Sequence, residues 1–153
     1  MKTNSKKIYL SIISLLIVII TGGIYKFIIQ GDTSKSSDGR ELIHLSAGEK
    51  DFVLTEMRLF LNSVQQITQG IAENDMEIVI AQAKASGAAM QREVPEKLAQ
   101  KLPLQFKKLG FDTHAKFEQL ALDTEDLGDR EHTLSQLSVL LQNCTSCHEI
   151  YRF

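Results

Sequence analysis

The chain has 153 residues, of which 43% are hydrophobic and 24% charged, and its formal net charge is −2. This length suits one domain with an additional segment. The slightly acidic balance argues against nucleic-acid binding, which usually needs a basic patch. With two prolines and no tryptophan in the whole chain, long helices are seldom interrupted.

The N-terminal segment, residues 1–29, predicts a transmembrane helix. Three lysines precede the run 8–25, which carries no charge. A run of about 18 residues at 1.5 Å each extends over roughly 27 Å, close to the hydrocarbon thickness of a bilayer. The preceding lysines favour a cytoplasmic N-terminus and an exported remainder. The alternative is a cleaved signal peptide that releases a soluble periplasmic protein, but its apolar core is normally shorter and residues 21–23 are a poor cleavage site.

The remainder of the chain predicts a flexible tether over residues 30–44 and an all-α domain over residues 45–153. The tether is rich in Ser, Gly and Asp and has no apolar periodicity. Helical periodicity dominates afterwards. A connection between two prolines, at 95–103, has room for a short helix. The four predicted helices cover residues 47–73, 75–93, 112–123 and 130–151.

Amphipathic helices with short connections fold most simply as an antiparallel four-helix bundle. In that arrangement the end of the last helix lies beside the start of the first helix. It also lies beside the start of the third and the end of the second. The predicted apolar stripe of the last helix consists of Leu134, Leu137, Leu140, Leu141, Cys144, Cys147, His148 and Tyr151.

Both cysteines of the chain lie in the pentapeptide C-T-S-C-H, residues 144–148. A disulfide between them closes a very short loop and restricts the unfolded chain little. A thioredoxin-like pair needs a helix N-terminus that lowers the thiol pKa, whereas this pair lies near a predicted helix C-terminus. A structural zinc site needs four ligands, and the remaining histidines, His44, His114 and His132, are scattered singles.

The same pentapeptide is the attachment pattern of haem c. Cys144 and Cys147 are spaced to form two thioether bonds with the haem vinyl groups, and His148 is placed to supply the proximal iron ligand. Covalent attachment takes place outside the bacterial cytoplasm, which agrees with the predicted export. The pattern therefore predicts one covalently bound haem c.

The resemblance extends beyond the pentapeptide. The ending C-T-S-C-H-E-I-Y-R resembles the C-x-x-C-H-x-x-Y-R ending of the cytochrome c prime family, the class II c-type cytochromes. Residues 102–121 are similar to the stretch that leads into the third helix of that family. The resemblance covers about 45–153 and implies a four-helix bundle with haem near its C-terminus. It also implies that Cys144 and Cys147 are thioether anchors and that His148 is the proximal ligand, with Arg152 either near the haem edge or at a solvated helix end.

The sixth position of the iron separates two functions. The spacing of Met57, Val64 and Ile67 resembles that in the first helix of low-spin, six-coordinate members of the family, which implies that Met57 is at the place of their methionine ligand. High-spin, gas-binding members have a non-ligand residue there. A methionine that merely fills a gap in the core is the other interpretation. His114 and Met90 are rival ligands, and an absent sixth ligand is a further alternative.

These features predict a membrane-anchored monohaem c-type cytochrome that is an electron-transfer protein and not an enzyme. His148 and Met57 are the expected axial ligands of the haem iron. Expected partners are redox proteins in the periplasm or the bacterial inner membrane, and the resemblance admits a homodimer. The alternatives are a five-coordinate protein that binds nitric oxide or carbon monoxide, and a haem-free structural domain.

Overall fold

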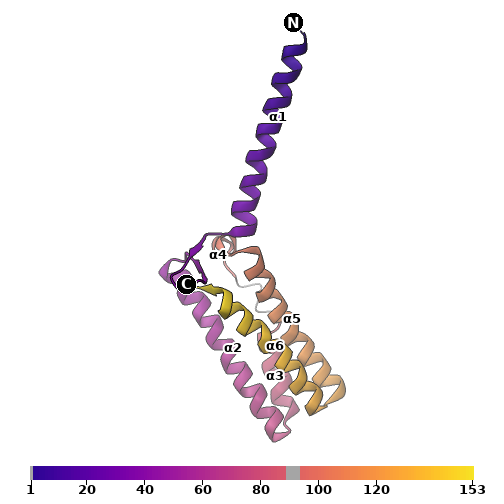
Figure 1. The fold of residues 1–153 in the computed structure, drawn as a ribbon. Coiled ribbons are helices and arrows are strands. Elements are labelled where there is room, and N and C mark those ends of the chain that lie inside the picture. Colours follow the sequence, from indigo (N-terminus) through magenta and orange to yellow (C-terminus); the bar gives the residue numbers. More distant parts are fainter. Residues whose placement is uncertain (1, 89–93) are drawn as a thin grey trace.

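The computed structural model describes residues 2–88 and 94–153, and the chain is mostly helical, as predicted (Figure 1). A long N-terminal helix projects from a helical domain, and a small sheet lies where the two meet. In chain order the elements are α1 (Lys2–Ile24), η1 (Tyr25–Gln30), β1 (Thr33–Lys35), β2 (Glu41–Ile43), α2 (Ala47–Glu73), α3 (Met76–Ser86), α4 (Glu96–Lys101), α5 (Leu104–Leu127), α6 (Arg130–Ile150) and β3 (Tyr151–Arg152).

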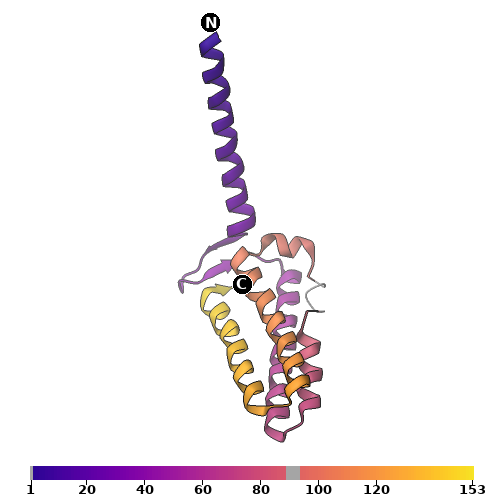
Figure 2. The same cartoon turned by 90° about the vertical axis from the view of Figure 1, so that its right-hand side faces the viewer.

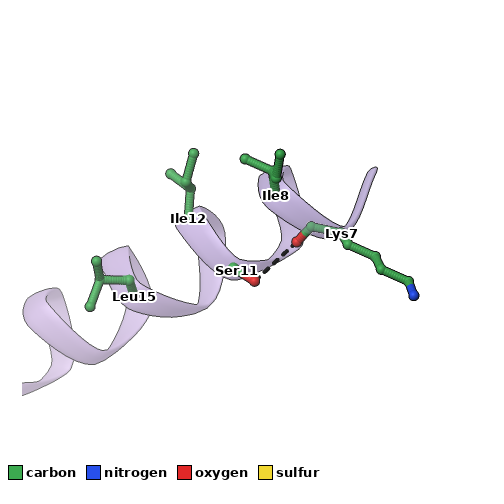
Figure 3. Close-up of a pocket in the computed structure, with 5 residues that line it drawn as sticks. All are labelled: Lys7, Ile8, Ser11, Ile12 and Leu15. Atoms are coloured by element: carbon green, nitrogen blue, oxygen red, sulfur yellow. Dashed lines mark hydrogen bonds between the residues drawn. The ribbon is translucent and has the colours of Figure 1, made fainter. Parts of the chain in front are cut away.

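Helix α1 projects from the domain (Figure 2). It continues into the π-helical turn η1, which contacts α4 and α5. Residues 6–30 form a helix that is long and apolar enough to cross a membrane, a property shared by signal sequences. A shallow indentation on its side is lined by Lys7, Ile8, Ser11, Ile12 and Leu15 (Figure 3). All five residues belong to one helix, so no second element closes this indentation into a site.

Residues 33–43 form a β-hairpin, although the segment 30–44 was expected to be a flexible tether. Strand β1 pairs with β2 in antiparallel register, with Thr33 opposite Ile43. Strand β2 then pairs in parallel with β3, with Glu41 opposite Tyr151. Ile43 is 1% exposed and fixes the hairpin in the apolar interior. The composition of the segment did not predict the burial of Ile43, because a single buried side chain produces no repeating apolar pattern.

The boundaries of α2 agree with the prediction because both ends carry local signals. Ser46 and Glu49 form a capping box at its start, and Asn74 ends it in the left-handed conformation with φ 59°. Helix α3 begins after Asp75, whose carboxylate accepts a hydrogen bond from the Ile78 amide at 3.2 Å. It ends at Ser86, before the predicted end at 93, and residues 89–93 lie outside the described residues.

The prediction for the next helix was wrong at both ends. Helix α5 begins at Leu104 instead of 112 and ends at Leu127 instead of 123. Gly110 lies inside the helix, although glycine is a poor helix former that favours a helix start after it. Pro103 precedes the first helical residue with φ −57°, an angle suited to a helix start. The helix stops only at Gly128, which adopts the left-handed conformation.

The long helices of the domain pack in a closed ring of neighbours: α2 on α3, α3 on α5, α5 on α6 and α6 on α2. Their buried side chains form two clusters. The central cluster comprises Ile67, Ile71, Val79, Ala83, Phe117, Leu120, Ala121, Leu137 and Leu140. The hairpin-end cluster comprises Ile43, Val53, Leu98, Leu102 and Tyr151 and lies at the end of the domain that carries the sheet.

Helix α6 shows a narrower buried face than its sequence suggested. Leu137 and Leu140 are buried, but Leu134 is 53% and Leu141 37% exposed, and His148 is also exposed. These three residues recur every seven positions and lie along one flank of the helix. The predicted stripe therefore divides into a core-facing line and an accessible flank that ends in an imidazole.

Candidate functional site

The two cysteines lie on the last turns of α6, three residues apart and therefore on one face of the helix. Both are half-buried free thiols. Cys144 packs against the central cluster, and Cys147 packs against the hairpin-end cluster. The pair thus lies where the two clusters meet.

Burial makes these thiols poor nucleophiles in the folded domain. Burial raises the pKa of Cys147 to about 11, and the neighbouring Cys144 adds a smaller increase. Burial also raises the pKa of Cys144. Both groups are therefore protonated near neutral pH. A catalytic dithiol pair needs a lowered pKa, so the burial of both thiols argues against a thioredoxin-like redox function.

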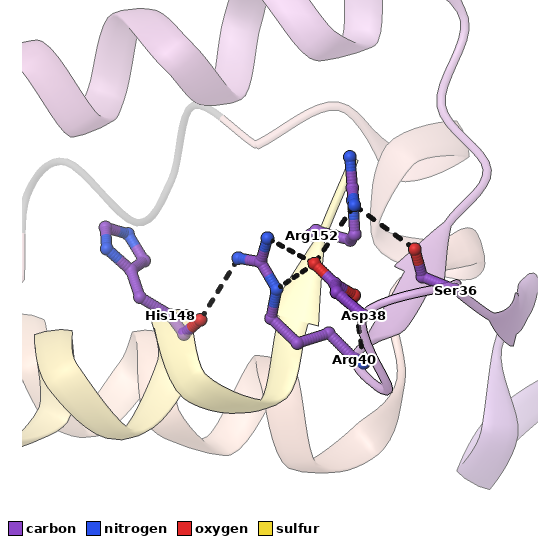
Figure 4. Close-up of polar contacts among 5 residues, drawn as sticks. All are labelled: Ser36, Asp38, Arg40, His148 and Arg152. Atoms are coloured by element: carbon purple, nitrogen blue, oxygen red, sulfur yellow. Dashed lines mark hydrogen bonds and ion pairs between the residues drawn. The ribbon is translucent and has the colours of Figure 1, made fainter.

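His148 directly follows Cys147, and its main chain is held by the hairpin (Figure 4). The Arg40 guanidinium donates a hydrogen bond from Nη1 to the His148 carbonyl oxygen at 3.3 Å. The same guanidinium donates from Nη2 to Asp38 at 2.7 Å. The imidazole ring of His148 points away from this group of charges (Figure 4). The hairpin therefore fixes the backbone at the end of α6 and leaves the ring accessible.

Arg152 does not continue the helix but lies in β3, where it joins the same group of charges. Its Nη1 lies 3.0 Å from the Asp38 carboxylate and 3.2 Å from the Ser36 hydroxyl. The side chain of Arg40 and, to a smaller extent, its backbone amide donate hydrogen bonds to the Asp38 carboxyl and hold its pKa well below its usual range. Asp38 therefore accepts from two arginines and joins the hairpin to the end of the chain. We call Ser36, Asp38, Arg40 and Arg152 the hairpin clasp.

Met57 lies in the first half of α2, is half-buried and packs against the hairpin-end cluster, as Cys147 does. The fold thus brings a thioether and the second cysteine to the same apolar cluster although 90 residues separate them (147 − 57). This proximity was predicted from the antiparallel order of the helices. Which residue ligates a metal stays a prediction.

His114, the rival ligand, lies inside α5, ten residues after its first residue, and its side chain is buried. It is 6% exposed, its Nδ1 lies 2.8 Å from the Ser86 carbonyl oxygen, and its ring centroid lies 5.0 Å from that of Phe60. Phe60 packs against the central cluster. The other rival, Met90, lies outside the described residues.

Two polar features of this region were not found by sequence reasoning. The hairpin clasp had a local signal, because Asp38-Gly39 is a typical turn pair and Gly39 has φ 86°. The second feature is a buried hydrogen bond of 2.9 Å from the Ser86 hydroxyl to that of Ser63. It joins α3 to α2, and serine at a helix position carries no sequence signal of a partner 23 positions away.

Among residues 2–88 and 94–153, no group of three or more His, Cys, Asp or Glu side chains is arranged to hold a metal ion. A structural zinc site built only from such residues is therefore not formed in the described part of the chain. The donors at this end are two thiols, one exposed imidazole and one thioether. They suit a cofactor that brings its own metal and is attached through sulfur.

Comparisons with known proteins gave no relative from which a function could be transferred. No family model matches the chain, and no curated protein and no solved structure was found to be similar to it. Any functional assignment of this chain therefore depends on its own residues and their arrangement.

Proposed function

We propose that this protein is a membrane-anchored monohaem c-type cytochrome that transfers single electrons. The observation that carries the proposal is the C-x-x-C-H turn at the end of α6, with both thiols on one face and the imidazole of His148 exposed beside them. In this proposal the four long helices of the domain form an antiparallel bundle of the cytochrome c prime type. The protein catalyses no substrate chemistry of its own.

Each donor has a defined role in this proposal. Cys144 and Cys147 would hold haem c through thioether bonds, and His148 would be the proximal ligand. The iron of haem c supplies reversible one-electron exchange between its ferrous and ferric forms. The half-buried face of α6 shields the two cysteine side chains in part from water, and Arg40 holds the backbone of His148 by a hydrogen bond. This bond supports a constant orientation of the proximal ligand.

Met57 is the proposed sixth ligand because it shares the hairpin-end cluster with Cys147. His114 is less suitable, since its Nδ1 already bonds to the Ser86 carbonyl and its ring contacts Phe60 beside the central cluster. A thioether opposite an imidazole favours the ferrous state and raises the reduction potential relative to two imidazoles. Ligation by Met57 therefore implies a low-spin carrier and not a gas-binding protein.

The proposed location is the bacterial inner membrane, with α1 as a single span and the haem domain in the periplasm. The length and apolar composition of residues 6–30 support a membrane span, and the lysines before the apolar run support the orientation. Redox proteins of the same membrane or of the periplasm are the proposed partners. Cleavage after α1 would give a soluble periplasmic carrier with the same haem site.

The proposal is tested on full-length protein purified from a host that attaches haem c. A pyridine haemochrome assay and the intact mass establish whether one haem is bound. A colourless protein of the mass of the bare chain overturns the proposal. A wild-type protein that is high-spin and binds carbon monoxide supports the five-coordinate alternative instead.

The sixth ligand is tested by comparing the wild-type spectrum with that of Met57→Leu. We expect the variant to become high-spin and to bind carbon monoxide. Met76→Leu is the matched control, because Met76 is also half-buried but packs against the central cluster. It should keep the wild-type spectrum. An unchanged low-spin spectrum of Met57→Leu would exclude Met57 as the ligand.

A further inference from the structure

The membrane helix enters the domain without a free connecting segment. Helical structure in η1 ends at Gln30, and the Asp32 amide already donates a hydrogen bond to the Lys101 carbonyl oxygen at 2.8 Å. The intervening Gly31 is buried, and a Cβ atom at this position would lie 2.4 Å from that same oxygen. The His44 amide in turn donates to the Asp32 carbonyl oxygen at 2.9 Å. The chain is therefore bound to α4 as soon as it leaves η1.

The end of the membrane helix lies beside the end of α6. Figures 1 and 2 both place the C-terminus and the sheet at the end of the domain from which α1 emerges. One groove is lined jointly by η1, by the start of α5 and by the last residues of α6 and β3. Its residues include Tyr25, Ile29, Leu104, Lys108, Ile150 and Tyr151.

The C-x-x-C-H turn lies close to this groove. His148 precedes Tyr151 by three residues, and three helical residues extend over roughly 5 Å along the axis. The opposite end of the domain is far away, since the helical rise from Gln105 to Asp126 amounts to about 30 Å. The proposed haem site therefore lies at the membrane-proximal end of the domain.

The lysines exposed at this end suit a phospholipid surface, although Asp32 is also exposed there and Glu41 lines the groove. Lys26 of η1, Lys97 of α4 and Lys108 of α5 are exposed, and Glu96 lies beside Lys97. Lysine ammonium groups pair with headgroup phosphates, and the carboxylate suits the amine of a zwitterionic headgroup. Because η1 joins α4 without a free linker, these side chains are held close to the level at which α1 would leave the bilayer.

We propose that the end of the domain that carries the C-x-x-C-H turn rests on phospholipid headgroups in a fixed orientation. This inference rests on the proposed membrane anchor but does not require haem. A domain held in this way presents the end of α6 to proteins embedded in the same membrane. A soluble carrier approaches the opposite end of the domain more easily.

The orientation is tested by photo-crosslinking of the full-length protein in nanodiscs of phosphatidylethanolamine and phosphatidylglycerol. The crosslinker p-benzoylphenylalanine is introduced at Gln105, which lines the groove, or at Asp126, an exposed control position at the far end of α5. We expect abundant lipid adducts at Gln105 and few at Asp126, measured by mass spectrometry. Equal yields at the two positions, or no adduct at Gln105, would overturn the inference.

A second variant separates a fixed orientation from mere tethering. Insertion of about 20 Gly and Ser residues between Gln30 and Gly31 adds a flexible span of roughly 25 Å. We expect the adduct yield at Gln105 to fall several-fold, because the effective concentration of lipid at this face falls. An unchanged yield would mean that the connection does not fix the domain. The adducts are measured independently of colour, so their loss is distinguishable from a failure to bind haem.

Discussion

Gly31 is the position at which a single methyl group should have the largest effect on how the chain joins the domain. It has φ 68° and ψ −161°, a combination that is essentially restricted to glycine. A Cβ atom there would meet Lys101 O at 2.4 Å, Pro103 N at 2.8 Å and Leu102 C at 2.9 Å. All three are backbone atoms, so no side chain can rotate to make room. Gly31→Ala must therefore move the backbone away from α4.

The expected size of this effect follows from two contributions. Backbone strain at such a φ and ψ amounts to about 1–3 kcal/mol. Separation of the two segments also breaks the 2.8 Å hydrogen bond from Asp32 to Lys101, which contributes about 0.5–1.5 kcal/mol. We expect the free energy of unfolding to fall by about 2–4 kcal/mol, which lowers Tm by roughly 10 °C for a domain of this size.

The measurement is thermal and urea unfolding in detergent, followed by circular dichroism. Gly39→Ala is the matched control, because Gly39 has φ 86° but a Cβ atom added there would meet no atom within 4 Å. The free energy of unfolding of Gly39→Ala should fall only by the strain of a non-glycine residue in the left-handed region, about 1–2 kcal/mol. If Gly31→Ala were no more destabilising than Gly39→Ala, the close approach to α4 would be refuted.

Three further substitutions test the packing and the charges. Ser86→Ala leaves the buried Ser63 hydroxyl without its 2.9 Å partner and should lower the free energy of unfolding by about 1–3 kcal/mol; a double-mutant cycle with Ser63→Ala should show less than the sum of the two single effects. The Lys101 side chain beside Glu49, together with Ser46, lowers the pKa of that carboxyl from 4.5 to about 2. The ionised Glu49 carboxylate therefore stabilises the fold above pH 4.5, and this contribution is lost as the pH falls to about 2. Glu49→Gln should flatten the dependence of Tm on pH in that interval. An unaltered slope would contradict this assignment. Leu140→Ala removes a fully buried side chain of the central cluster and should lower the free energy of unfolding by about 2–5 kcal/mol in urea titrations; a loss below about 1 kcal/mol would mean that the site is poorly packed.

The sequence was most informative where caps and apolar periodicity agreed. Helix α2 has a capping box at Ser46, and α6 has Asp129, whose carboxylate accepts two backbone hydrogen bonds. Both helices were predicted within one residue at each end. The start of α5 was missed because Gly110 is a weak breaker when its neighbours are helical. The hairpin was missed because its stability depends on Ile43 and on pairing with the distant β3.

The candidate site was predictable in its local part and less so in its surroundings. The face shared by Cys144 and Cys147 follows from helical spacing alone, and the proximity of Met57 to Cys147 follows from antiparallel order. The hydrogen bond from Arg40 to the His148 carbonyl spans 108 positions and has no signal in the sequence. Contacts of this kind depend on the complete fold, since each partner is an ordinary surface residue by type.

The position of the two cysteines between separate apolar clusters has a consequence for cooperativity. Cys144 contacts the central cluster and Cys147 the hairpin-end cluster. A rigid group bonded to both sulfur atoms would add a covalent link between the two clusters, which already share helices α2, α5 and α6. Loss of either thiol would remove this link, so that a single steep unfolding transition would broaden.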